Sequence, residues 1–177
     1  MNWIEQVLKQ LRLSETYKRY AYPDPLSSLA KKYPASKYGW GDKPASQILK
    51  DLDVNPDDGA PWTVGYGYTH GVTPDTEFSV GMAEHKLKEV VQDCVVQVPK
   101  LVPNFIDQHD VIKAVLVDMC YNMGPKTLAT FKNTLRNFII KDYDQAAKGM
   151  EASLWAKQTK SRAKRLVRMV RTLKFEE

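Results

Sequence analysis

The sequence predicts an α+β fold, in which a small N-terminal lobe with a short β-sheet precedes a mainly helical C-terminal lobe. Three observations predict it. An amphipathic helix opens the chain, two short aromatic segments with strand-like alternation flank a Pro- and Gly-rich stretch, and apolar residues recur at helical spacing through most of the second half. The 177 residues are 43% hydrophobic and 27% charged, which is ordinary for one soluble globular domain.

The N-terminal lobe is predicted from its helix, strand and loop signals. Apolar residues share one helical face in the first stretch, which indicates a helix over residues 2–14. Residues 17–22 alternate and are rich in tyrosine, and residues 62–68 hold glycines of the kind that let backbone approach closely, so both indicate short strands. Between them, residues 25–61 contain five prolines and predict a long irregular loop, with room for one short helix over 46–52.

The C-terminal lobe is predicted from helical apolar faces. These faces occupy residues 83–95, 111–120 and 163–173, and residues 143–155 are also compatible with a helix. We expect the first lobe to span about residues 12–82, including the loop 25–61. The second lobe is expected to span about residues 83–177 and to include the helix 2–14, all within one domain of residues 1–177.

The net charge of +5 indicates contact with polyanions such as nucleic acid, anionic membranes or bacterial walls. Residues 157–174 hold eight basic side chains, but an apolar stripe in the same stretch indicates a core-facing helix, so we expect no nucleic-acid partner. The three histidines lack metal-binding spacing, so we expect no metal and no cofactor. Cys94 and Cys120 lie on apolar helical faces and are expected to be core thiols, although a bond between them stays open.

The N-terminus and the apolar stretches indicate where the protein is made. The N-terminus lacks the apolar core of a secretory signal, and no stretch is apolar enough for a membrane span. We therefore expect a protein that is made in the cytoplasm without a signal peptide and is not stably inserted in a membrane.

Two motifs carry a family resemblance. Glu15 is followed nine residues later by Asp24 within Ala-Tyr-Pro-Asp-Pro, and residues 60–67 read Ala-Pro-Trp-Thr-Val-Gly-Tyr-Gly. Together they resemble the catalytic segments of phage-type lysozymes, glycoside hydrolase family 24. The segments 122–124, 131–136 and 155–165 resemble the T-even phage branch of that family. The resemblance covers the chain except about residues 26–58.

The resemblance implies a lysozyme-like fold and an N-acetylmuramidase, a glycosidase that hydrolyses the β-1,4 bond between N-acetylmuramic acid and N-acetylglucosamine in peptidoglycan. Glu15 matches the general acid, Asp24 the general base, and Thr63 the residue that holds the attacking water. The branch is regarded as inverting, which needs carboxyl groups roughly 6.5–9.5 Å apart, whereas about 5–5.5 Å would indicate a nucleophile. The sequence leaves this choice open.

Four further residues match positions of the resembled branch. Thr69, Tyr121 and Thr134 match residues that line the sugar cleft, and Arg162 matches an arginine that pairs with the catalytic Glu. The alternative for Tyr121 is a core tyrosine on the helix 111–120. The alternative for Arg162 is a solvated basic residue.

Two departures from the family pattern bear on these assignments. Tyr68 occupies the position where the family usually has a structural histidine. Asp24 and Thr63 are 39 residues apart, far more than in the shortest family members, and Asp57 lies only six residues before Thr63. We prefer Asp24 because the Ala-Tyr-Pro-Asp-Pro context belongs to it.

The resemblance also implies a biological role, that of an endolysin. Such a protein acts as a monomer on peptidoglycan glycan strands, reaches the wall after holin-type release, and lyses the host cell. Alternatives are a lytic transglycosylase on the same glycan, which needs no second carboxylate, and a non-catalytic wall-binding or virion protein.

Overall fold

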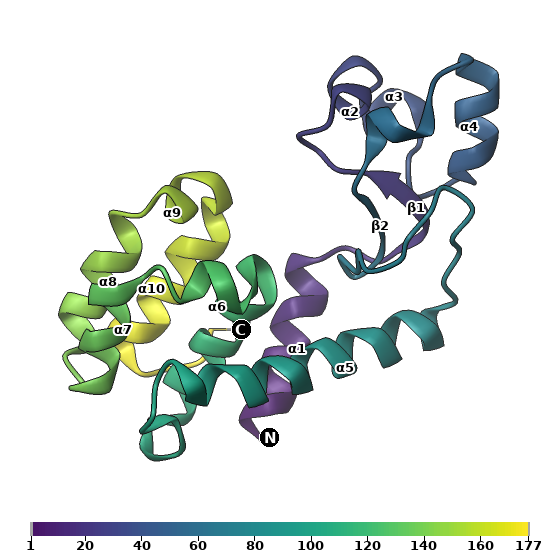
Figure 1. Ribbon diagram of the computed structural model, residues 1–177. Helices are drawn as coiled ribbons and strands as arrows, with labels where there is room; N and C mark the ends of the chain where they lie inside the picture. Colours follow the sequence, from purple (N-terminus) through teal and green to yellow (C-terminus); the bar gives the residue numbers. More distant parts are fainter. Residues whose placement is uncertain (1, 177) are drawn as a thin grey trace. The chain divides into compact units, whose positions relative to one another are not determined.

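The structure is a computed structural model that describes residues 2–176, and the chain divides into two compact units. The small unit is Glu15–Glu89. The helical unit combines the residues up to Ser14 with those from Val90 onward. The division falls within the long helix α5 (Val80–Gln97), drawn in teal in Figure 1. Each unit is described by itself below.

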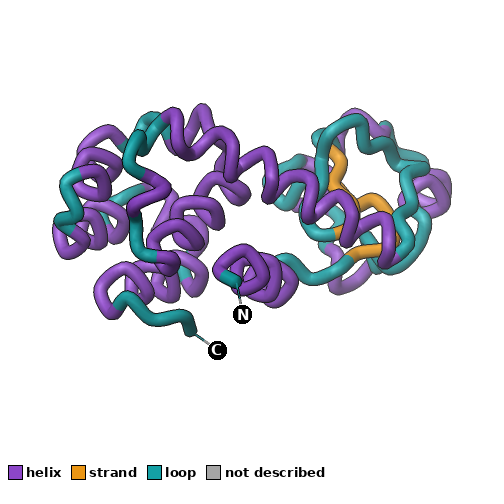
Figure 2. The backbone as a smooth tube through the Cα atoms, turned by 90° about the horizontal axis from the view of Figure 1, so that it is seen from below, coloured by secondary structure: helices purple, strands orange, loops and turns teal. Residues whose placement is uncertain are grey.

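A two-stranded antiparallel sheet forms the middle of the small unit. Strands β1 (Lys18–Pro23) and β2 (Trp62–Gly65) confirm the two strand predictions, and they are the orange segments of Figure 2. The register pairs Tyr22 with Thr63 and Pro23 with Trp62. β2 is shorter than predicted because Gly65 has a φ of +66°, so the chain turns and Val64 forms backbone hydrogen bonds with Tyr68 at 2.9 Å in both directions.

The insertion (residues 25–61) corrects the predicted irregular loop, because it folds into four short helices. These are α2 (Ser28–Lys32), α3 (Ala35–Tyr38), α4 (Ala45–Leu52) and the 3₁₀ helix η1 (Pro56–Gly59). Only α4 corresponds to the short helix predicted over 46–52. The other helices are too short to show helical periodicity, and they depend on buried contacts instead.

A buried apolar cluster explains why the insertion is ordered. Trp40 lies edge-on to Trp62 of β2, with ring centroids 5.9 Å apart, so the insertion packs onto the sheet. The members of the cluster are Ala21, Leu29, Trp40, Ala45, Ile48, Leu49 and Trp62.

The helical unit is built around α6 (Asp110–Leu128), which is buried along most of its first three turns. The helix breaks at Gly124, which has a φ of +77° and precedes Pro125. The other helices of the unit are α1 (Trp3–Ser14), η2 (Val98–Lys100), η3 (Phe105–Asp107), α7 (Lys132–Ile139), α8 (Tyr143–Glu151), α9 (Leu154–Thr159) and α10 (Ser161–Thr172). Among them α7 was not predicted, and the stretch 143–155 contains α8 and the start of α9.

Two cysteines lie inside the helical unit. Cys94 of α5 and Cys120 of α6 are both buried and free, as predicted for core thiols. The hydrogen bond between them, together with burial, raises the pKa of the Cys94 thiol. This raised pKa keeps the thiol protonated and unreactive at neutral pH.

The arrangement confirms the predicted α+β class, since the small sheet near the N-terminus is followed by a mainly helical remainder. Within residues 2–176, none of the helices combines the length and the apolarity that crossing a membrane requires.

Candidate active site

Glu15 directly follows α1 and is partly buried at the start of the small unit. The preceding residue is fixed, because the Ser14 hydroxyl donates to the Gln10 carbonyl and accepts from Arg165 Nη1, both at 2.9 Å. The turn after β2 passes close to the carboxyl group, since a Cβ built on Gly67 would lie 3.4 Å from Glu15 Oε2. Gly67 also has a φ of +87°, so glycine suits this position on both counts.

Asp24 lies one residue beyond β1, where the two ends of the insertion meet. Its backbone N–H donates to the carbonyls of Gly59 and Pro61, each at 3.1 Å. Its Oδ1 accepts from the Leu26 N–H at 2.6 Å. These bonds tie Asp24 to the residues that lead into β2, even though many residues separate the two in sequence.

The pKa of Tyr22 responds to the charges of both Glu15 and Asp24. This pKa rises to about 12, first because of burial and then because of the negative charges of Glu15 and Asp24. The charges of both carboxyl groups therefore act on one phenol. Thr63 pairs with Tyr22 across the sheet and is 8% exposed, and directly paired residues project from the same face.

In the small unit, Thr63 thus pairs with Tyr22 across the sheet, and the charges of Glu15 and Asp24 act on the same tyrosine. Sequence reasoning missed Tyr22, although its position two residues before Asp24 in an alternating strand was a usable signal.

Three other residues of the small unit were considered from the sequence. Thr69 is exposed in the turn after Tyr68, and Asp57 is exposed in η1. Tyr68, which replaces the family's usual histidine, packs its ring 5.7 Å from Phe78 and lies under the Lys86 ammonium.

In the helical unit, Arg162 of α10 is not a solvated residue. Its Nε donates to Asp118 Oδ1 at 2.7 Å, and its side chain is 9% exposed. Arg165 Nη2 donates to the other oxygen of Asp118 at 3.2 Å. Asp118 is fully buried and was not singled out from the sequence, although a lone acid within the apolar run 111–120 was the signal.

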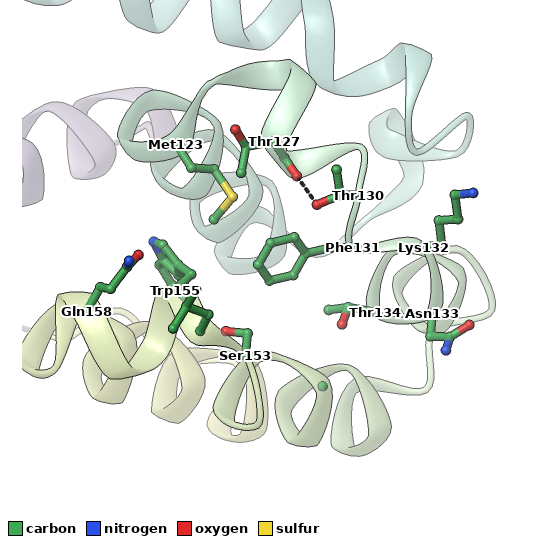
Figure 3. A pocket seen from close by; sticks show the side chains of 12 residues that line it. Met123, Thr127, Thr130, Phe131, Lys132, Asn133, Thr134, Ser153, Trp155 and Gln158 are labelled. Carbon is green, nitrogen blue, oxygen red and sulfur yellow. Dashed lines mark hydrogen bonds between the residues drawn. The ribbon is translucent and has the colours of Figure 1, made fainter.

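Thr134 lines a pocket of the helical unit, about 760 Å³ in volume. Figure 3 shows Met123, Phe131 and Trp155 facing a common space, with the Thr130 hydroxyl donating to the Thr127 carbonyl at 2.6 Å. The Phe131 and Trp155 rings meet edge-on, with centroids 6.5 Å apart. Tyr121 is partly buried in α6 and does not line this pocket.

Metal ligation has no support in the part of the chain that the structure describes. Within residues 2–176, His, Cys, Asp and Glu side chains form no group of three or more that could hold a metal ion.

Two carboxyl groups are the groups with which most glycosidases act, and comparison with known proteins gives the family. The family model described as "Phage lysozyme" matches residues 50–172. This is well over half of the chain, which therefore belongs to the phage lysozyme family. The match includes Thr63 of the small unit. It also includes Tyr121, Thr134 and Arg162 of the helical unit, but it begins after Glu15 and Asp24.

One relative among the curated proteins is "Probable T4-type lysozyme 1" of Dictyostelium discoideum. It is 30% identical to this chain over 74 residues, which are 42% of this chain and 44% of the relative. The aligned region thus spans less than half the length of that relative.

Proposed function

We propose that the protein is a muramidase that hydrolyses the β-1,4 bond between N-acetylmuramic acid and N-acetylglucosamine in bacterial peptidoglycan. In this proposal Glu15 is the general acid that protonates the leaving oxygen. Asp24 is the general base on the opposite side of the bond, and it acts through a water held by the Thr63 hydroxyl. Membership in the phage lysozyme family supports the substrate class.

The observation that carries the proposal is that two carboxylate charges of the small unit act on Tyr22. Glycoside hydrolysis needs two carboxyl groups at one bond, one to give a proton and the other to activate water. The charges of Glu15 and Asp24 both raise the pKa of the same phenol, and Thr63 pairs with that tyrosine in the sheet. Asp57 is exposed and does not contribute to this pKa, which favours Asp24 as the base.

Further residues are proposed to bind sugar or to support catalysis. Tyr121 and Thr134, together with Thr69 of the small unit, are proposed to bind sugar. Arg162 is proposed to have a supporting role, and its Nε donates to Asp118 Oδ1 at 2.7 Å. The biological role that we propose is host lysis by a monomeric endolysin that reaches the wall after holin-type release.

The test is mass spectrometry of the soluble products from purified peptidoglycan, for the wild type and for Glu15→Gln. We expect muropeptides with reducing ends from the wild type and none from the variant. Anhydro-sugar ends would instead indicate a lytic transglycosylase and would remove the role of Asp24. The absence of product from both proteins would indicate a wall-binding or virion protein.

A further inference from the structure

A second pocket of the helical unit is lined by residues of α8, α9 and α10 (Figure 1) and has a volume of about 410 Å³. This volume lies within the range of roughly 300–1,000 Å³ that is usual for ligand pockets. Its apolar part consists of Ala156, Ala163 and Val167, of which the last two are buried residues of α10. Among the residues that line this pocket, none has a part in the proposed hydrolysis. The pocket is therefore a candidate site for a ligand of its own.

Three lysine side chains give this pocket its charge. Lys157 belongs to α9, Lys164 lies near the start of α10, and Lys160 is the single residue between the two helices. The one carboxylate in the lining, that of Glu151, accepts from Nη1 and Nη2 of Arg171 at 2.9 and 2.7 Å. Within the part of the chain that the structure describes, the three lysines form no ion pair. Their positive charges are therefore available to an anionic ligand.

The backbone of Lys160 has a conformation that is unusual for a lysine. Its φ is +41° and its ψ is −95°. A residue with a Cβ rarely adopts a positive φ, whereas glycine does so without steric cost. Such conformations are concentrated at functional sites, where the surrounding structure holds them. A lysine at this turn, in place of glycine, indicates that the side chain has a role besides forming the turn.

The composition of the lining favours a phosphate group as the ligand. Lysine binds phosphate as a point charge, whereas planar recognition of a carboxylate typically uses arginine, and Arg171 is already bonded to Glu151. The lining has no aromatic residue on which the bases of a nucleic acid could stack. It also has no Trp, Phe or Leu of the kind that a membrane-surface helix inserts among lipids. A phosphodiester that is joined to short aliphatic carbons matches both the lysines and the alanine and valine surface.

We propose that this pocket binds a polyol phosphate polymer of the poly(glycerol phosphate) type, with a phosphate beside the three lysines and glycerol carbons against Ala163 and Val167. The inference goes beyond the proposed function, because hydrolysis of a glycosidic bond uses no phosphate group. Since phosphates recur along such a polymer, one chain can meet all three lysine charges. The pocket attaches the helical unit to a phosphate-bearing wall polymer whether or not the glycan is cut.

The binding test measures the fluorescence anisotropy of fluorescein-labelled poly(glycerol phosphate) at low salt. Replacing Lys157, Lys160 and Lys164 together by Gln should weaken binding about hundredfold, because one basic side chain near an anionic surface contributes about fivefold. The matched control removes the same charge from three other exposed lysines of the helical unit, namely Lys9, Lys100 and Lys126. The control should bind much more tightly than the pocket variant. An equal loss in both would mean that net charge alone drives binding, and would overturn the proposal.

A single substitution separates binding from folding. Lys160→Gly removes one charge and also relieves the positive φ, so the melting temperature should stay the same or rise while the affinity falls about fivefold. A folded Lys160→Gly protein with unchanged affinity would reject the site.

Three further probes determine the class of ligand. Polyglycerol without phosphate should not bind. A single-stranded oligonucleotide with the same number of phosphates and vesicles of phosphatidylglycerol should bind more weakly than poly(glycerol phosphate), with equal affinity for the pocket variant and the control. Tighter binding of either one that is lost in the pocket variant would assign the pocket to nucleic acid or to a membrane, and would overturn the proposal. None of these measurements depends on cleavage of the glycan, so failure of the proposed function would not be mistaken for failure of this site.

Discussion

Tyr22 reports on both proposed catalytic acids, because burial and their charges together raise its pKa to about 12. A phenol ordinarily titrates near 10, so the folded protein holds this proton more tightly than the unfolded chain does. The resulting stabilisation is fully present below pH 10. It is lost as the pH rises from 10 through about 12, because in this range the Tyr22 phenol ionises in the unfolded chain and stays protonated in the folded protein.

The first prediction concerns this phenol. Glu15→Gln and Asp24→Asn should each lower the pKa of Tyr22, because each removes one negative charge near it. The measurement is an NMR titration of ring-labelled tyrosine, with Tyr22→Phe used to assign the signal. Glu89→Gln is a suitable control, since this carboxylate is bonded to Lys86 and does not contribute to the Tyr22 pKa. A Tyr22 pKa that stays the same in both variants would show that the acids do not lie beside it.

The second prediction separates Asp24 from Asp57. Asp24→Asn should lower the rate of wall hydrolysis by about 10²–10⁴-fold, the usual contribution of general acid–base catalysis. Asp57→Asn should leave the rate unchanged, because Asp57 is exposed in η1 and does not contribute to the Tyr22 pKa. Reducing-end assays at matched protein concentration would measure both, with thermal melting to confirm that each variant is folded. The reverse pattern would assign the base to Asp57.

At the scale of elements, the insertion is a folded part of the small unit with buried residues of its own. Trp40 belongs to this cluster. The rings of Trp40 and of Trp62 in β2 meet edge-on. The Trp40 side chain also forms part of a pocket beside Glu15. The core contacts that order the insertion therefore also shape the pocket beside Glu15.

The third prediction tests this link. Trp40→Ala should destabilise the small unit by about 3–5 kcal/mol, as is usual when a buried aromatic side chain is truncated. Leu26→Ala, at a residue that is 74% exposed in the same insertion, should have little effect. Hydrogen exchange of the backbone amides would locate the change, and we expect faster exchange over residues 26–61. Unaltered protection of these amides would mean that Trp40 does not hold the insertion together.

The elements that could be predicted from the sequence are those with a repeating pattern. The long helices and both strands carry periodicity over enough residues to be recognised, whereas α2, α3 and η1 have four or five residues each and show none. The pairing of Tyr22 with Thr63 also could not be predicted, because it depends on the register of the two strands. Motif resemblance identified Glu15, Asp24 and Thr63, and their roles stay predictions.

For the whole molecule, the net charge of +5 is the property that bears most directly on an anionic wall. Opposite charges attract over distances set by the ionic strength, with a screening length of about 30 Å at 0.01 M and about 8 Å at 0.15 M. The basic surface would therefore speed the encounter with the wall more strongly at low salt than at physiological salt.

The fourth prediction follows from this charge. The initial rate of clearance of purified cell walls should fall as salt rises from about 0.01 to 0.15 M, because screening weakens the long-range attraction. Hydrolysis of an uncharged soluble glycan in the same buffers should change little, which controls for direct effects of salt on the protein. A clearance rate that rises or stays flat would exclude electrostatic attraction as a factor.

The two cysteines of the chain are both buried inside the helical unit, so the folded protein offers thiol reagents no native target at its surface. A single cysteine introduced at an exposed position such as Ser46 would then be the one site open to maleimide chemistry. A fluorophore or a solid support could be attached there in a defined orientation, with neither native cysteine replaced. The packing of α5 against α6 thus makes this protein a convenient starting point for site-specific conjugation.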